Sequence, residues 1–292
     1  MNRDLADEIT KKIITLMETN GSDWRRPWLG DGLAKNIASG KSYRGINIPI
    51  LGSTGFSSNT WGTYKQWGEV GAQVRKGEKA TQIFFWKPLD INDRVTEEEK
   101  HILMARSYSV FNRDQVDNSP PEKKDERTPI ERHAEFDRII AATGAAITYG
   151  GDRAAYIPSQ DRIVMPKAEQ FRTTEGFCGV LAHETAHWSG APTRLNRDLS
   201  GRFGDKAYGL EELIAETSAA LTCIAAGVIP EPRAESAKYL NNWIEAMRED
   251  KRIIVTVFSK AQAATDFILG ERPTPEPTRP EPATSSPTLQ PI

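Results

Sequence analysis

The stretch Val180-Leu181-Ala182-His183-Glu184-Thr185-Ala186-His187-Trp188 decides the fold of the second half of this chain, because it contains the pattern H-E-x-x-H. Residues four apart share one face of a helix, so His183 and His187 can hold a single metal ion there. Glu184 follows the first histidine and can take a proton from a water molecule beside that ion. The pattern is short, and the alternative is a pair of surface histidines on an ordinary amphipathic helix.

A third metal ligand is expected further along the chain. The chain has only four histidines and the other two lie upstream, so a carboxylate is the natural third ligand. The next predicted helix, around residues 209–217, carries Glu212 and Glu216 four apart on one face. We expect Glu212 to bind the metal and Glu216 to orient a ligand histidine, although the two roles could be exchanged. Glu211 lies about 100° further round this helix and is expected to face solvent. The expected metal is Zn²⁺, with another divalent metal as the alternative.

Composition predicts a soluble globular protein of two domains in a chain of 292 residues. No apolar run approaches the ~20 residues of a membrane span, so we expect no membrane partner. The N-terminus begins a helix, over residues 4–19, rather than a secretion signal. Cys178 and Cys223 are expected to be small buried residues rather than a disulfide. These features predict a cytoplasmic protein.

The N-terminal half is basic and rich in tryptophan. Between residues 24 and 88 there are ten basic residues against three acidic ones, in a chain whose net charge is −2. The same stretch holds five of the seven tryptophans. Cations for phosphates and flat rings for unstacked bases are typical of proteins that bind single-stranded nucleic acid. The alternative is that the tryptophans form the core of a small domain. The candidate DNA contacts are Arg25, Arg26, Tyr43, Arg44, Asn47, Lys65 and Lys76, with Trp24 and Trp61 as stacking rings.

The pattern of apolar residues and turns predicts an α+β protein. In the N-terminal half, residues 73–74 and 81–86 are expected to pair as a hairpin, and residues 106–111 form another strand beyond an acidic insertion at 90–100. In the C-terminal half, residues 154–166 form a hairpin and residues 235–269 form one or two closing helices. We predict a domain over residues 1–116, a linker over 117–130, a domain over 131–270, and a disordered proline-rich tail over 271–292.

With both halves considered, the chain resembles the ArdC-type antirestriction proteins of conjugative plasmids. In the N-terminal half the resemblance lies in residues 24–28, 43–47, 61–66 and 74–79, a region that the family shares with the N-terminal part of TraC-type plasmid primases. In the C-terminal half it lies in residues 156–166, 183–190, 194–195 and 208–216, which are similar to the metallopeptidase-like domain of polyvalent plasmid and phage proteins.

The resemblance implies a small mixed α/β domain that binds single-stranded DNA, followed by a zincin-like metallopeptidase domain of the gluzincin kind. It implies that the protein binds the incoming strand during conjugation and protects it from restriction. Whether the metal centre cleaves peptides is left open by the sequence. The alternatives are an active zinc protease directed at DNA-bound proteins, and a direct inhibitor of restriction enzymes whose metal is structural. In a peptidase, Arg194 and Tyr208 are the candidates to stabilise the carbonyl oxygen.

Overall fold

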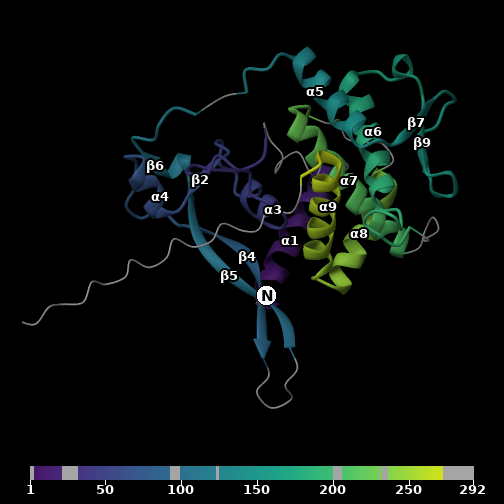
Figure 1. The fold of residues 1–292 in the computed structure, drawn as a ribbon. Helices are drawn as coiled ribbons and strands as arrows, with labels where there is room; N and C mark the ends of the chain where they lie inside the picture. Colours follow the sequence, from purple (N-terminus) through teal and green to yellow (C-terminus); the bar gives the residue numbers. More distant parts are fainter. Residues whose placement is uncertain are drawn as a thin grey trace, which may run out of the picture.

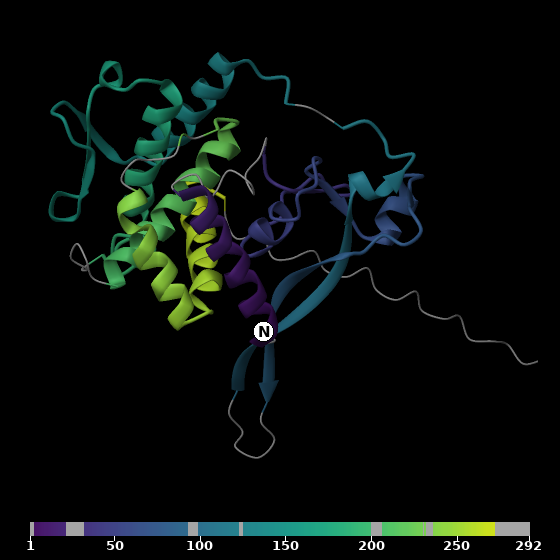
Figure 2. The same ribbon diagram turned by 180° about the vertical axis from the view of Figure 1, so that it is seen from behind.

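The computed structural model describes residues 3–21, 32–92, 99–122, 125–199, 206–229, 231 and 236–271. In both views the larger helices gather on one side, and a long two-stranded ribbon of the N-terminal sheet extends away from them (Figures 1 and 2). This mixture of helices and sheets confirms the α+β class. The helices are α1 Arg3–Asn20, α3 Asn47–Gly52, α4 Tyr64–Glu69, α5 Pro129–Ala142, α6 Thr174–Ser189, α7 Lys206–Ala226, α8 Ser236–Glu249 and α9 Ile253–Leu269. The strands are β1 Lys35–Asn36, β2 Thr60–Gly62, β3 Gln73–Val74, β4 Thr81–Asn92, β5 Glu99–Asn112, β6 Val116–Asp117, β7 Ala146–Tyr149, β8 Ala155–Ile157 and β9 Arg162–Met165.

The N-terminal sheet has the strand order β1-β2-β5-β4, with β1 and β2 parallel and the other neighbours antiparallel. One face of this sheet carries a small core that includes Trp61, Ile83 and Val110, and residues Tyr43 and Leu51 cover it. Trp67 belongs to a second cluster and is fully buried, and its indole Nε1 donates a hydrogen bond to the carbonyl of Phe111. Trp61 and Trp67 therefore follow the alternative interpretation, in which tryptophans form the core.

The predicted hairpin between residues 73–74 and 81–86 is wrong. Strand β3 pairs with β6, which lies 42 residues later in the chain, whereas β4 pairs with β5 over its whole length. Thr81 lies opposite Val110, so the long β5 satisfies the hydrogen bonds of β4 and leaves β3 to find another partner. The acidic insertion contains the end of β4 and the start of β5, and its residues 93–98 lie outside the described part.

Helix α1 packs with the C-terminal helices, although the sequence assigns it to the N-terminal domain. Ile13 and Met17 of α1 share one core with Trp243 and Met247 of α8, and α9 contributes to the same core. Figures 1 and 2 both show α1 beside α8 and α9. The domain boundaries remain a prediction, but the two halves of the chain are joined by this common core.

The C-terminal half has a three-stranded sheet of order β7-β9-β8 beside its helices. The predicted hairpin is confirmed, since β8 and β9 are antiparallel and Asp161 takes a left-handed conformation at the turn. Helix α5 begins with a capping box in which Thr128 and Glu131 satisfy each other's backbone N–H groups. The closing segment forms two helices, α8 and α9, and Cys178 and Cys223 are buried free thiols. Among the described residues, no helix has both the length and the apolar character needed to cross a membrane. The proline-rich tail beyond residue 271 lies outside the described residues.

Candidate metal centre

Helices α6 and α7 bring the candidate metal ligands together. Thr173 caps the start of α6 by accepting a hydrogen bond from the backbone N–H of Gly176. Ala182 and Ala186 of α6 are fully buried in the same cluster as Ala215 and Ala219 of α7. Because these side chains are small, the two helices can approach closely enough for histidines of α6 to meet glutamates of α7.

His183, His187 and Glu212 each offer one ligand atom, and the three atoms lie within 4.8 Å of one another. The two Nε2 atoms are 3.0 Å apart, and they lie 3.5 and 3.4 Å from the carboxylate oxygens of Glu212. Donor atoms around a tetrahedral Zn²⁺ lie about 3.3 Å apart when the bonds are about 2.0 Å long, so this arrangement fits a small divalent metal. It brings together the three ligands that the sequence predicts.

The other ring nitrogen of each histidine is held by a second glutamate. Nδ1 of His183 lies 3.1 Å from Oε2 of Glu216, which is the orienting contact expected from the sequence. Nδ1 of His187 lies 3.2 Å from Oε1 of Glu211. The expectation that Glu211 faces solvent is therefore wrong. Thirteen consecutive residues of α7, from 211 to 223, are buried, so this stretch of the helix has no solvent-facing side for Glu211 to occupy.

Arg197 completes this arrangement, and the sequence analysis did not identify it. Its guanidinium donates to both oxygens of Glu211, at 3.0 and 2.8 Å, and to the backbone carbonyl of Ala186. A Cβ at Gly190 would lie 2.8 Å from Nη2 of Arg197, so glycine is needed where the guanidinium passes the end of α6. A buried arginine needs a carboxylate partner, and the pair of adjacent glutamates in α7 was the only signal for this contact in the sequence.

The site is rich in buried negative charge. Glu184, Glu211, Glu212 and Glu216 are all buried, and Arg197 is the buried cation beside them. Burial alone would raise the pKa of the Glu212 carboxyl, but hydrogen bonds from His183 and His187 hold that pKa well below its usual range. Burial alone would lower the pKa of His187, but hydrogen bonds to Glu211 and Glu212 raise it to about 10. A divalent cation would balance this excess of carboxylates.

The candidate general base is fixed by an edge strand. Oε2 of Glu184 accepts a hydrogen bond of 2.9 Å from the backbone N–H of Tyr156 in β8. Strand β8 is at the edge of its sheet. Because the N–H of Tyr156 bonds to Glu184 of α6, the outer side of β8 faces the H-E-x-x-H helix. This contact is not evident from the sequence, because it joins a backbone group to a side chain 28 residues away.

Arg194 and Tyr208, the two candidates for stabilising a carbonyl oxygen, have protein partners. Arg194 forms an ion pair with Asp161, donates to the hydroxyl of Tyr156, and lies over the ring of Trp188 at 4.0 Å. Burial raises the pKa of the Tyr208 hydroxyl, and hydrogen bonds with Tyr239 and Glu212 raise it further. Tyr208 therefore contacts the carboxylate of a candidate ligand, whereas Arg194 contacts the β8–β9 hairpin and the end of α6.

The candidate DNA contacts that the structure describes do not form one surface. Tyr43 and Asn47 are buried, and the Asn47 amide bonds to the backbone of Phe84 in β4. Trp61 is 1% exposed, so its ring cannot stack on a base. Arg44 forms ion pairs with Asp266 and Glu271 at the end of α9, which makes it a contact between the two halves of the chain. Lys65 and Lys76 are exposed, whereas Trp24, Arg25 and Arg26 lie outside the described residues.

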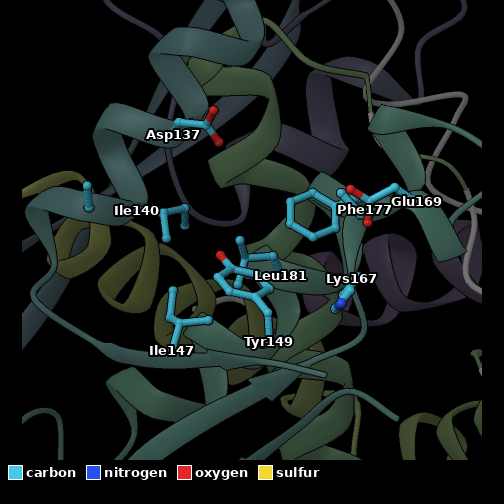
Figure 3. A pocket seen from close by; sticks show the side chains of 10 residues that line it. Asp137, Ile140, Ile147, Tyr149, Lys167, Glu169, Phe177 and Leu181 are labelled. Carbon is cyan, nitrogen blue, oxygen red and sulfur yellow. The ribbon is translucent and has the colours of Figure 1, made fainter. Parts of the chain in front are cut away.

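A separate cavity of about 730 Å³ lies between α5, α6 and β7 (Figure 3). Ile140, Tyr149, Phe177 and Leu181 line it. Leu181 is two residues before His183, about 200° round the helix, so the cavity and the metal centre lie on different sides of α6. The cavity has none of the candidate metal ligands among its lining residues.

These features define the chain as a zincin-like protein with an added N-terminal α/β domain. Residues 134–260 match the family of zincin-like metallopeptidases, and residues 3–111 match the N-terminal domain of the anti-restriction factor ArdC. The chain belongs to the ArdC antirestriction family. The solved metal-free structure of the antirestriction protein ArdC from plasmid R388 is 37% identical, with a TM-score of 0.74 over 91% of this chain and 96% of that one. The Mn(II)-bound structure of the same protein is 35% identical, with a TM-score of 0.74 over 91% of this chain and 97% of that one.

Two kinds of relative extend this comparison. The uncharacterized protein y4eC of Sinorhizobium fredii is 40% identical over 280 residues, which cover 91% of each chain. A DNA primase TraC of Escherichia coli is 34% identical over 293 residues, which cover 92% of this chain but 27% of the primase. The similarity to the primase therefore concerns about a quarter of that protein's length.

Proposed function

We propose that this chain is a cytoplasmic antirestriction protein that binds single-stranded DNA during plasmid conjugation and protects it from the recipient's restriction enzymes. The observation that carries this proposal is the similarity to ArdC along nearly the whole of both chains. The match of residues 3–111 to the ArdC N-terminal domain and the similarity to TraC primases support a role in DNA binding. The excess of basic residues in the N-terminal half supports it independently.

We propose further that His183, His187 and Glu212 bind a divalent metal, with Zn²⁺ as the first candidate. The short distances among their donor atoms and the buried carboxylates around them support this assignment. Glu216 and Glu211 would hold the histidine rings in the orientation that directs both Nε2 atoms to the metal. The Mn(II)-bound structure of the R388 protein makes Mn²⁺ the second metal to test.

A second candidate function is hydrolysis of a peptide bond, and the position of Glu184 favours it. A divalent metal in this site would polarise a carbonyl and lower the pKa of a water molecule. Glu184 has a carboxylate fixed by the N–H of Tyr156, and it would accept the proton of the attacking water and return it to the leaving amine. An extended peptide could lie along β8, whose outer side is not paired in the sheet. DNA-bound proteins or restriction enzymes are the candidate protein partners.

The proposed function is tested by fluorescence anisotropy with the full chain. A labelled oligonucleotide is titrated as a single strand and as a duplex at two salt concentrations. We expect tighter binding to the single strand, and weaker binding at high salt because cations on the protein release counterions from the phosphates. No binding to the single strand, or equal binding to the duplex, would contradict the proposal and would make a direct action on restriction enzymes the better account.

A further inference from the structure

The β4–β5 ribbon carries an aromatic pair at the edge of the N-terminal core. Phe85 and Tyr108 meet edge to face, with ring centroids 5.5 Å apart and planes at 79°. Tyr108 is 44% exposed, and Phe85 is half-buried. Phe85 packs against the core of this sheet face, whereas Tyr108 is not part of that core, so the exposed part of the tyrosine ring is not needed to fill it.

An exposed arginine lies beside this pair. Ile83 is opposite Tyr108 and Phe85 is opposite Arg106, so the side chains of these four residues point to the same face of the ribbon. Arg106 is exposed and has no acidic partner among the described residues. Two rings and an exposed guanidinium thus lie next to one another on one face of a regular strand pair.

Three other described aromatic residues of the N-terminal half are less suited to bind a base. The two tryptophans whose side chains are described, Trp61 and Trp67, are buried. Tyr64 is exposed, but its hydroxyl accepts a hydrogen bond from Gln73, and its neighbour Lys65 pairs with Glu69. The group formed by Phe85, Arg106 and Tyr108 therefore combines an exposed ring with a cation that has no acidic partner among the side chains that the structure describes.

We propose that Tyr108, Phe85 and Arg106 form a platform on which one base of single-stranded DNA stacks while the guanidinium contacts a phosphate. This inference rests on the proposed DNA-binding function and names the residues that perform it. A flat ring binds any unstacked base, and a neighbouring cation adds attraction to the backbone, which suits binding without sequence preference. The basic character of the N-terminal half favours an anionic ligand over a neutral or basic protein surface, and the exposed ring favours a nucleic acid among anionic ligands.

The test is a set of anisotropy titrations of full-length variants with labelled single-stranded DNA. Tyr108→Ala removes the ring, and we expect the Kd to rise about 5- to 150-fold. Tyr108→Phe keeps the ring, and we expect a Kd close to that of the wild type. Arg106→Gln should weaken binding and reduce the slope of log K against log salt by about 0.7.

Matched controls come from the C-terminal half. Tyr149 of β7 is 51% exposed and stacks on Phe177, so Tyr149→Ala removes a similar ring from a similar strand. Arg172 is likewise exposed without an acidic partner among the described residues, so Arg172→Gln removes a comparable charge. Both controls should leave the Kd unchanged, and circular dichroism should show that all variants are folded.

The outcomes separate this inference from the function on which it rests. If the wild type does not bind the single strand, the proposed function fails. If the wild type binds and folded Tyr108→Ala binds equally well, the platform is overturned while the function stands. A loss with Tyr108→Ala that Tyr108→Phe reproduces would also overturn it, because stacking requires the ring and not the hydroxyl.

Discussion

Nδ1 of His187 lies 3.2 Å from Oε1 of Glu211, and this contact connects the candidate metal centre to a buried arginine. Arg197 holds the same carboxylate with two hydrogen bonds, so the ring of His187 is oriented through Glu211 by a side chain beyond the end of α6. The ring of His183 is oriented by a different glutamate, Glu216. The two histidines thus have different supports, and the difference can be tested.

Replacing Glu211 with Gln should weaken metal binding about 10- to 100-fold, because the neutral amide holds the His187 ring less firmly. It should also destabilise the metal-free protein by ~3–5 kcal/mol, since Arg197 would be left as a buried charge without its carboxylate. Isothermal titration with Zn²⁺ and Mn²⁺ measures the first effect, and denaturant unfolding measures the second. Glu135→Gln is the control, because Glu135 pairs with Arg138 on the surface of α5. An unchanged metal affinity would mean that Glu211 does not position the ring.

Glu184→Gln separates hydrolysis from metal binding. The amide keeps an oxygen that can accept the N–H of Tyr156, but it cannot take a proton from water. We expect the variant to bind metal and DNA like the wild type and to lose any peptidase activity of the wild type. His183→Ala should instead lose metal binding and the rise in melting temperature that saturating metal produces. Equal hydrolysis by the wild type and Glu184→Gln would exclude Glu184 as the base.

Trp61→Ala should unfold or strongly destabilise the N-terminal sheet, by ~3–5 kcal/mol, because the indole is part of the core with Ile83 and Val110. Thermal unfolding followed by circular dichroism measures this loss. The result matters for DNA binding, because weaker binding by this variant would come from lost structure. A folded variant with specifically weakened DNA binding would instead support the stacking role that the sequence suggested for Trp61.

The sequence indicated that the candidate metal ligands could meet because their spacing depends only on helix geometry, and one donor atom each of His183, His187 and Glu212 lies within 4.8 Å of the others. His183 and His187 share one face of α6, and Glu212 and Glu216 share one face of α7. Residues four apart share a face in any α-helix. The position of Glu211 could not be predicted in the same way. It depends on how many helices surround α7, and helices from distant parts of the chain cover the whole stretch from 211 to 223. The prediction that β3 pairs with β4 failed for a similar reason. The partner of a strand depends on competition among strands far apart in the chain, and β3 pairs with β6.

The DNA contacts predicted in the N-terminal half also depended on contacts between distant parts of the chain, which the sequence does not show. The sequence indicated a basic, aromatic region, and the structure divides these residues between core and surface. Tyr43 and Asn47 serve the fold, and Arg44 reaches Asp266 of α9. Composition gives the number of rings and charges, but their exposure is set by which face of the sheet is covered.

The free energy of unfolding should decrease as the pH is lowered, because the carboxylate of Asp114 becomes protonated. Burial alone would raise its pKa, but hydrogen bonds from the hydroxyl and N–H of Ser57 and the N–H of Ser58 lower it below the model-compound value of 3.8. A lowered folded-state pKa stabilises the protein above the unfolded value, and this contribution is lost as the pH falls through the folded value. Asp114→Asn should therefore lower stability at pH 6 by less than about 1 kcal/mol after solvent screening, and should reduce the loss below pH 4. Urea unfolding between pH 3 and 6 measures both effects.

Helix α1 should stabilise the C-terminal helices, although more than 200 residues separate them in the chain. Ile13 and Met17 are buried in the core that includes Trp243 and Met247 of α8, so Ile13→Ala or Met17→Ala should cost ~2–5 kcal/mol. Thr15 lies on the exposed side of the same helix, and Thr15→Ala should have little effect. Hydrogen exchange measured by mass spectrometry should show faster exchange in α8 and α9 for the two core variants only. Unchanged exchange in α8 would mean that α1 can leave this core without loosening it. In that case residues 1–116 could fold apart from the metal centre, as the predicted domain boundaries require.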